Sequence, residues 1–365
     1  MSSRDVLHLP TEVIQLIYGV KHPSRVSGGV GEPVLSLKDR ALLKLSLDVD
    51  RQVLQDSLAA LCSFTRLEEL ELRVGASNGD KVLDLAALQP LKALKSLQCS
   101  SCATAELRGG TLLPQLTSLT FTCTKHVVVE AALPSLQHLL VFKAICGSAA
   151  NVIIDAALPS LQTLSMSLVG ELQLAGEHLQ LPQLTHLSLS DVHKSAINWK
   201  ALHQLVDLRV NTNCADLFMS APPSLSRLTS LTLSWGRYSQ DEVARMLQAA
   251  LPSLRHLSLG PYIDWSRPPP FHLVPNLTSL ACSGPNVLQH LGPLTQLQRL
   301  ELANAANALS AAHIERLGRL TTLRLLRFGL EQLTAGDAAG RHIQELKDVL
   351  PAGCKLEQPE ERPAF

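Results

Sequence analysis

A short leucine pattern that recurs along most of the chain constrains the fold more than any other feature. In LPSLRHLSLG (residues 251–260), three leucines are spaced L-x-x-L-x-L behind a Leu-Pro pair, and LPQLTHLSLS (181–190) and LPSLQTLSMS (158–167) are near copies. Because residues i and i+2 of a strand point to the same face, the L-x-L part predicts a short strand with one apolar face. One such strand cannot bury this face alone, so we predict that successive copies stack into an array.

Thirteen triplets of this kind follow one another between residues 42 and 325, and their third members lie 20 to 27 residues apart. One triplet is a weak signal in a leucine-rich chain, whereas a near-regular succession of them is a strong one. The triplets are Leu42/Leu45/Leu47, Leu67/Leu70/Leu72, Leu94/Leu97/Cys99, Leu116/Leu119/Phe121, Leu136/Leu139/Val141, Leu161/Leu164/Met166, Leu184/Leu187/Leu189, Leu205/Leu208/Val210, Leu228/Leu231/Leu233, Leu254/Leu257/Leu259, Leu277/Leu280/Cys282, Leu297/Leu300/Leu302 and Leu320/Leu323/Leu325.

With this spacing the chain resembles the leucine-rich repeat superfamily over about residues 37–356. The resemblance implies an α/β solenoid, or horseshoe, with about 13 parallel strands on its concave face and mixed helices and turns on its convex face. The family often places Asn or Cys three residues after the triplet, and here only Cys102 and Asn213 match. The resemblance is therefore to the irregular repeats of ribonuclease-inhibitor-like and F-box-associated arrays.

Three regions follow from the pattern. Residues 1–36 are expected to form a capping helix, within residues 9–20, and a flexible loop. Residues 37–330 form the solenoid. Residues 331–365 are expected to form a C-terminal capping helix, an edge strand at residues 354–357 and a tail. Caps of this kind keep the end repeats from exposing their core.

Some return segments between the triplets have a helical pattern. Residues 239–251 place apolar side chains at helical spacing, and residues 49–64, 309–318 and 338–350 are also expected to be helical. Residues 122–132 are rich in β-branched side chains, so we expect extended structure there.

Composition excludes several classes of function. Lys plus Arg equals Asp plus Glu at 32 each, which removes the electrostatic argument for a nucleic-acid partner. No run of about 18 apolar residues predicts a membrane span, and the first residues do not resemble a signal peptide. We expect a cytoplasmic protein with neither nucleic-acid nor membrane partners; the alternative location is the cytoskeleton, or the axoneme of a cilium.

No motif of a catalytic site is present. The patterns G-x-S-x-G, H-E-x-x-H and G-x-x-x-x-G-K-[ST] are absent, so we expect neither enzymatic activity nor a cofactor. Cys99 and Cys282 occupy leucine positions and are interpreted as reduced core residues. Cys99 and Cys102 form a C-x-x-C pair, to which we assign a structural role because two further zinc ligands are missing.

Three histidines, His138, His186 and His256, each precede the second leucine of a triplet and should face the concave surface. The two closest lie about 10 Å apart, which is too far to share a metal ion, so we interpret them as contact residues. Arg209 belongs to the row between the second and third triplet members, which also faces this surface.

Aromatic residues are concentrated in two loops. Five of the chain's thirteen aromatics fall within 37 residues, with two arginines beside them. Large rings and arginines are enriched at the centres of protein interfaces, which favours a partner-binding rim. The alternative is that the rings only cover the core. The rim residues are Trp235, Arg237, Tyr238, Tyr262, Trp265, Arg267 and Phe271.

Together these observations predict a non-catalytic scaffold that binds a protein partner through the concave face and the aromatic rim. A first alternative is an F-box-like substrate receptor of an SCF-type ubiquitin ligase, because LPTEVIQLIY (9–18) resembles the opening helix of an F-box; a Skp1-type adaptor would then be a partner. The usual aromatic ending is missing, since the first Trp is Trp199. A second alternative is a structural component of a cytoskeletal or ciliary assembly.

Overall fold

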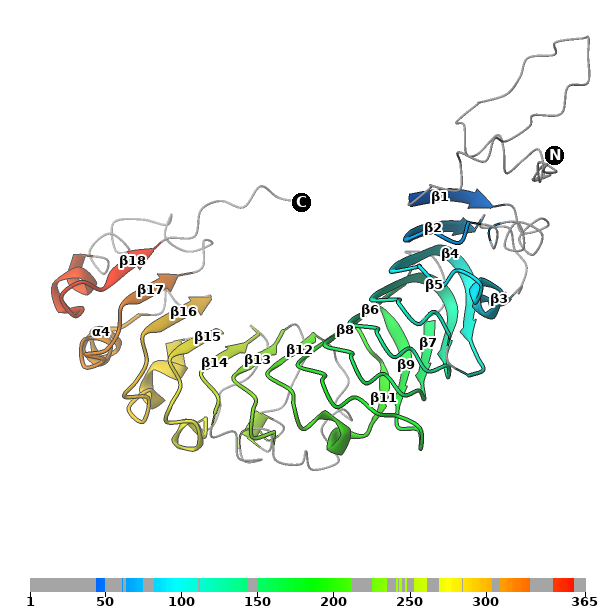
Figure 1. Cartoon of the computed structure of the whole chain (residues 1–365). Coiled ribbons are helices and arrows are strands. Elements are labelled where there is room, and N and C mark those ends of the chain that lie inside the picture. The colour runs from blue at the N-terminus through cyan, green and yellow to red at the C-terminus, as the bar shows by residue number, and fades with distance from the viewer. Residues whose placement is uncertain are drawn as a thin grey trace, which may run out of the picture. The chain divides into compact units, whose positions relative to one another are not determined.

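In a computed structural model the chain is built from parallel strands and short return segments (Figure 1). It divides into two compact units, Met1–Leu184 and Thr185–Phe365. The structure describes residues 44–49, 61, 64–74, 82–110, 112–143, 150–211, 225–234, 241, 243–244, 247, 253–260, 269–283, 285–303, 309–328 and 344–357.

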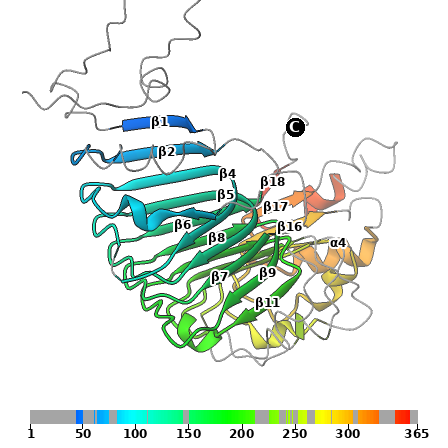
Figure 2. The same ribbon diagram turned by 90° about the vertical axis from the view of Figure 1, so that its right-hand side faces the viewer.

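In the N-terminal unit, each leucine triplet forms one strand of a parallel ladder. The register places triplet leucine opposite triplet leucine, as in the row Leu70, Leu97, Leu119, Leu139 and Leu164. Figure 2 shows these strands lying side by side. They are β1 (Lys44–Val49), β2 (Glu69–Val74), β4 (Ser96–Leu107), β5 (Ser118–Val129), β6 (His138–Lys143) and β8 (Thr163–Ser167).

The C-terminal unit repeats the arrangement. Its strands pair in parallel, each with the triplet strand that follows it in the sequence, and a final short strand closes the ladder. The predicted solenoid of parallel strands is thus confirmed in each unit. The strands are β10 (His186–Ser190), β12 (Asp207–Asn211), β13 (Ser230–Leu233), β14 (His256–Leu259), β15 (Ser279–Ser283), β16 (Arg299–Ala303), β17 (Leu325–Phe328) and β18 (Lys355–Glu357).

The number of strands is higher than the sequence predicted. Beyond the 13 triplet strands and β18, the described residues contain β3 (Val82–Asp84), β7 (Ala150–Ile154), β9 (Val169–Leu174) and β11 (Lys194–Ile197). The second halves of β4 and β5 pair with β3 and β7, and β7 pairs with β9, so the return segments of the N-terminal unit form a second parallel ladder. The extended structure expected at residues 122–132 is part of it.

The core lies between the triplet strands and the return segments. Second and third triplet members are buried wherever the structure describes their side chains; Leu97, Phe121 and Met166 are each no more than 1% exposed. Return segments contribute a second set of buried side chains, among them Val127 and Val152. Aliphatic layers of this kind, stacked rung upon rung, bury apolar area that no single repeat could bury alone.

The register corrects the last triplet. In β17 the buried side chains are Leu326 and Phe328, which lie opposite Leu300 and Leu302. The triplet is therefore Leu323/Leu326/Phe328, and the assignment Leu320/Leu323/Leu325 was wrong by three residues. Leu320, Leu323 and Leu326 are three residues apart, so a triplet could begin at Leu320 or at Leu323. Only the pairing of β17 with β16 shows that it begins at Leu323.

Hydroxyl groups join successive repeats just before the triplet strands. In the L-P-S-L stretches, Ser135 Oγ donates to the carbonyl of Pro114 and Ser160 Oγ to the carbonyl of Pro134, both at 2.6 Å. Ser253 Oγ donates to Ser226 O at 2.7 Å. Each bond crosses from one repeat to the preceding one, so the serine after the proline fixes the position of each turn on its neighbour.

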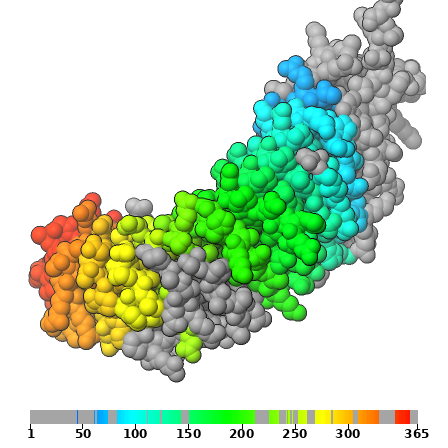
Figure 3. Space-filling view, turned by 60° about the horizontal axis from the view of Figure 1, so that its bottom comes forward, coloured from blue at the N-terminus to red at the C-terminus, as the bar shows by residue number. Residues whose placement is uncertain are grey.

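The return segments of the C-terminal unit contain helical turns. They include η3 (Trp199–Leu202), η5 (Phe271–Leu273), η6 (Pro285–His290) and α4 (Ala311–Gly318), whereas η2 (Leu85–Leu88) lies in the N-terminal unit. Helix α4 confirms the helix expected at residues 309–318. In Figure 3 the yellow and orange segments of this unit pack closely together. Among the described residues, no helix is both long and apolar enough to cross a membrane.

The chain bends after several triplet strands at residues with positive φ, a backbone conformation that L-residues rarely adopt. Ser101, Leu168 and Asp191 each stand two positions after a third triplet member and have φ of 61°, 60° and 51°. A left-handed conformation costs a residue with a Cβ roughly 1–2 kcal/mol. Leu168 is also 40% exposed, so its side chain regains little of this energy by burial.

We therefore expect Leu168→Gly to raise the free energy of unfolding by about 0.5–1 kcal/mol, because glycine adopts φ near 60° without strain. The measurement is urea unfolding followed by circular dichroism. Ser167→Gly, one residue earlier inside β8, is the control and should destabilise the protein. A lower unfolding midpoint for Leu168→Gly would contradict the argument.

The cysteines divide into two classes. Cys99 and Cys282 are free and buried in triplet positions, as predicted, and burial raises the pKa of both thiols to about 12. Cys102, to which the sequence assigned only a structural role, is disulfide-bonded. Disulfides persist in oxidising environments, so the expectation of a reducing cytoplasm stays a prediction without support from this residue.

Several predictions lie partly or wholly outside the described residues. These are the capping helix and loop of residues 1–36, most of the helices expected at residues 49–64 and 239–251, and the tail after residue 357. Among the described residues of these segments, Leu61, Asp241, Val243, Ala244 and Leu247 are helical as expected, whereas Phe64 is not. Residues 344–349 are helical within the expected 338–350, and β18 lies within the expected edge strand.

Candidate functional site

The candidate site is the outward face of the triplet strands, formed by the side chains that alternate with the buried leucines. In β8, for example, Leu164 and Met166 are buried, whereas Thr163, Ser165 and Ser167 are half-buried on the other side. This alternation follows from the two-residue period of a strand. The outward side chains are not needed for the core, so they can be chosen for contact.

Four adjacent strands of the N-terminal unit carry no Asp, Glu, Lys or Arg on their outward face. The register arranges twelve residues of β4, β5, β6 and β8 in three rows of four, which we call the uncharged field. All are half-buried or exposed. The rows are Ser96, Ser118, His138, Thr163; Gln98, Thr120, Leu140, Ser165; and Ser100, Thr122, Phe142, Ser167.

Apolar side chains lie within this field of small hydroxyls. Phe142 is 36% exposed and stands between Thr122 and Ser167, and Leu140 is half-buried on the same strand. The exposed Leu168 follows directly after Ser167. An exposed phenylalanine on a rigid strand costs solvation energy in the free protein, which a partner could recover by covering it.

Charge returns at the next strand. On β2 the outward residues are Glu69, Glu71 and Arg73, and Arg73 pairs with Glu71 at 2.8 Å. The uncharged field is therefore bounded on this side by a charged strand. A charge-poor centre with a charged border is the composition typical of interface cores and rims.

The outward face of the C-terminal unit is more polar. Arg209 Nε donates to Asp207 Oδ2 at 3.0 Å, and Thr185 Oγ1 lies 2.8 Å from His186 Nδ1. The Asp207–Arg209 pair is exposed on the arginine side, so it contributes little to stability. Its effect is instead to hold the guanidinium in one position on the surface.

The predicted histidines are not brought together. His186 and His256 are both exposed and stand in one row, but β12 and β13 lie between their strands, a separation of about 14 Å. His138 is exposed in the N-terminal unit. Within the described part of the chain, no group of three or more His, Cys, Asp or Glu side chains is arranged to hold a metal ion.

The aromatic rim is only partly described. Trp235, Arg237, Tyr238, Tyr262, Trp265 and Arg267 lie outside the described residues, so their role stays a prediction. Phe271 is described, in η5, and is 0% exposed. Its ring is a core residue in the structure, as in the alternative interpretation, and is not available to a partner.

The sequence contains the signal for the uncharged field, but no single row of residues shows it. Gln98, Thr120, Leu140 and Ser165 belong to the row between the second and third triplet members. Phe142 stands one position after the third member, in a different row. Once all three outward positions of each repeat are aligned, the absence of charge over four repeats becomes visible.

No protein-family model matches the chain, and no curated protein matches its sequence. Solved structures show distant likeness. An internalin from Listeria monocytogenes is 16% identical, with 80% of this chain and 89% of that chain covered and a TM-score of 0.43. A complex of TLR13 with ssRNA13 is 17% identical, with 75% and 54% covered and a TM-score of 0.28. A leucine-rich repeat protein from Bacteroides ovatus is 10% identical, with 81% and 84% covered and a TM-score of 0.16. Identities this low concern the fold alone.

Proposed function

We propose that this chain, a leucine-rich repeat protein by the spacing of its triplets and the register of its strands, is a non-catalytic scaffold that binds a protein partner through its outward face. The observation that carries the proposal is the uncharged field. Its twelve residues include no Asp, Glu, Lys or Arg, although such residues make up 18% of the chain.

The chemistry of the field favours a protein partner. Hydroxyls of serine and threonine can donate and accept hydrogen bonds without the desolvation cost of a full charge. Phe142 supplies an apolar anchor of the kind that dominates the binding energy of interfaces. A partner that fits would present an apolar pocket for this ring, surrounded by backbone or amide groups and few charges.

The test is to place a charge at the centre of the field. Phe142→Glu should raise the Kd of the partner by at least about thirtyfold, because burying an unpaired carboxylate at an interface core is costly. The partner is first identified by quantitative capture with the full wild-type chain, without reference to either variant. Its affinity for purified variants is then measured by isothermal titration calorimetry.

Val82→Glu is the matched control. Val82 is 42% exposed and lies on β3, in the second ladder, so the substitution adds the same charge to the same unit away from the field. We expect its affinity for the partner to equal that of the wild type. If Phe142→Glu binds as tightly as Val82→Glu, the uncharged field is not the contact surface.

The finer predictions remain proposals. The aromatic rim is proposed as a separate contact surface of the C-terminal unit, in which Arg209, His186 and His256 are exposed. The F-box alternative depends on residues 9–18, outside the described residues, and the cytoskeletal or ciliary alternative depends on the resemblance alone. No described contact favours either alternative over the scaffold.

A further inference from the structure

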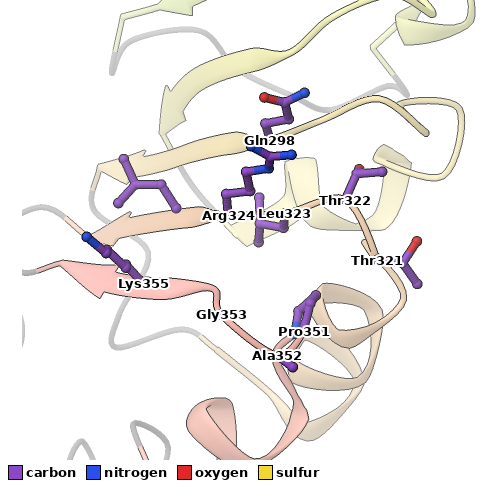
Figure 4. A pocket seen from close by; sticks show the side chains of 10 residues that line it. Gln298, Thr321, Thr322, Leu323, Arg324, Pro351, Ala352, Gly353 and Lys355 are labelled. Carbon is purple, nitrogen blue, oxygen red and sulfur yellow. The ribbon is translucent and has the colours of Figure 1, made fainter.

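A depression of the C-terminal unit carries two cationic side chains that the proposed function does not use. It has a volume of about 670 Å³ and is lined by Arg324 and Lys355, with no Asp or Glu. Figure 4 shows the two head groups pointing away from each other, so the depression does not form one anion site. The uncharged field, by contrast, contains a single titratable side chain, that of His138.

His138 stands on β6, the strand that also carries Leu140 and Phe142. Its side chain is exposed in the free protein and faces outward, as theirs do. Four residues of a strand span about 13 Å, so His138 lies about this far from Phe142. A partner that buries about 800 Å² on each side, the usual size of a specific interface, covers a patch about 28 Å across. A partner centred on the field therefore covers His138 as well as Phe142.

The sheet around His138 is uncharged. Four hydroxyl side chains surround it on the two flanking strands, and these are Ser118, Thr120, Thr163 and Ser165. On β6 itself, the other ionisable residue is Lys143, five positions away at the end of the strand. Lys95, which precedes β4, is already paired with Glu68 at 2.9 Å.

No carboxylate on the described neighbouring strands is placed to pair with a protonated His138. β8 carries no ionisable side chain, and β5 carries Lys125 and His126, which lie at its transition to the second ladder. The nearest outward carboxylates of the first ladder, Glu69 and Glu71, are on β2, three strands and about 14 Å away. This distance exceeds the screening length of about 8 Å at physiological salt.

We propose, on the basis of the proposed function, that the partner binds the field with His138 neutral, so that protonation of this imidazole weakens the complex. In the free protein the exposed ring is hydrated, so its charge costs little. Under a partner the charged ring loses this hydration and gains no carboxylate from its own chain, so burial disfavours it. Histidines ordinarily change charge near pH 6.5, so affinity is full at pH 7.5 and falls as the pH drops below 6.5.

The experiment measures the Kd of the captured and purified partner for the full chain at pH 7.5 and pH 5.5, by isothermal titration calorimetry. At pH 5.5 about ten of every eleven imidazoles are protonated, so the Kd of the wild type should rise by about tenfold. His138→Gln keeps a neutral polar side chain and should lose this rise. His138→Lys is charged at both pH values and should bind as weakly at pH 7.5 as the wild type does at pH 5.5.

His126→Gln is the matched control. His126 is also exposed in the N-terminal unit, but on the second ladder, so this variant should show the same rise as the wild type. Titrating groups of the partner affect all variants equally, and circular dichroism at both pH values checks that each variant is folded. The inference is overturned if His138→Gln shows the wild-type rise, or if the wild type binds as tightly or more tightly at pH 5.5.

Phe142→Glu at pH 7.5 separates this inference from the proposed function. If Phe142→Glu binds the partner like Val82→Glu, the field is not the contact surface and the proposed function fails. If Phe142→Glu loses affinity while the wild type shows no dependence on pH, only the role of His138 is overturned.

Discussion

Phe121→Ala is expected to lower the free energy of unfolding by about 3–5 kcal/mol, the usual cost of truncating a large ring in a closely packed core. Phe121 is the third triplet member of β5, is 0% exposed and lies opposite Cys99 and Val141 on the flanking strands. The chain has only seven phenylalanines, and its layers are mostly aliphatic. The small side chains beside Phe121 cannot fill the space that its ring leaves.

The architecture increases this cost. Each repeat of an array contacts only its neighbours, so a cavity in β5 weakens the interfaces with both β4 and β6. The measurement is urea unfolding followed by circular dichroism. Phe142→Ala removes the same ring from the outward face of the next strand and should cost less than about 1 kcal/mol, because Phe142 is exposed. Equal losses for the two variants would show that Phe121 does not fill the core.

Alkaline pH is expected to destabilise the protein through two buried thiols. Burial raises the pKa of Cys99 and of Cys282 from 9.0 to about 12. Well below pH 9 both thiols are protonated in the folded and unfolded states, so they do not make the free energy of unfolding depend on pH there. Above pH 9 the unfolded state releases protons that the folded state retains, so the free energy of unfolding falls by about 1.4 kcal/mol per pH unit for each thiol, until pH 12.

The double variant Cys99→Ala/Cys282→Ala isolates this effect. Truncation lowers its stability at every pH, but the two thiol titrations are absent. Between pH 9 and 10.5 the wild type should lose about 3 kcal/mol more than the double variant, measured by urea unfolding at each pH. Tyrosines and lysines titrate equally in both proteins. Parallel pH profiles for the two proteins would mean that these thiols are not buried as protonated groups.

The sequence predicted the triplet strands because their signal is local and repeated. Leu254, Leu257 and Leu259 define one rung by their spacing alone, and each further copy confirms the register of the others. The prediction failed where the spacing is degenerate: Leu320, Leu323 and Leu326 are three apart, and only pairing with Leu300 selects the correct set. The disulfide at Cys102 depends on an approach between residues that spacing does not predict.

The second ladder shows a different limit. Val127 and Val152 belong to β-branched runs that predict extended structure, but extended return segments could equally have been turns. That they pair with one another depends on the bend after each triplet strand, at residues such as Leu168. Strand propensity does not contain this information, because it says nothing about which strand lies alongside.

The same distinction, between what the sequence shows locally and what only strand pairing shows, applies to the outward side chains. The uncharged field can be found in the sequence once the triplets are aligned, because Phe142 and Thr122 each stand one position after the third member of their triplet. The position of Lys355 could not be predicted, because it follows Leu325 by 30 residues and lies opposite it only through the pairing of β17 with β18. The C-terminal return segment, described from residue 344, brings Lys355 beside β17.

The serine bonds of the L-P-S-L stretches have a consequence for how such a chain can change. Ser135, Ser160 and Ser253 anchor each repeat at one point just before its strand, and the strand itself supplies the other attachment. The described residues of the return segment between β15 and β16, which include η6, add no strand pairing to that attachment. A return segment of this kind can therefore gain or lose residues, as repeats of 20 to 27 residues already do, while the exposed side chains on the strands keep their geometry. Repeat length and surface chemistry are thus free to diverge independently.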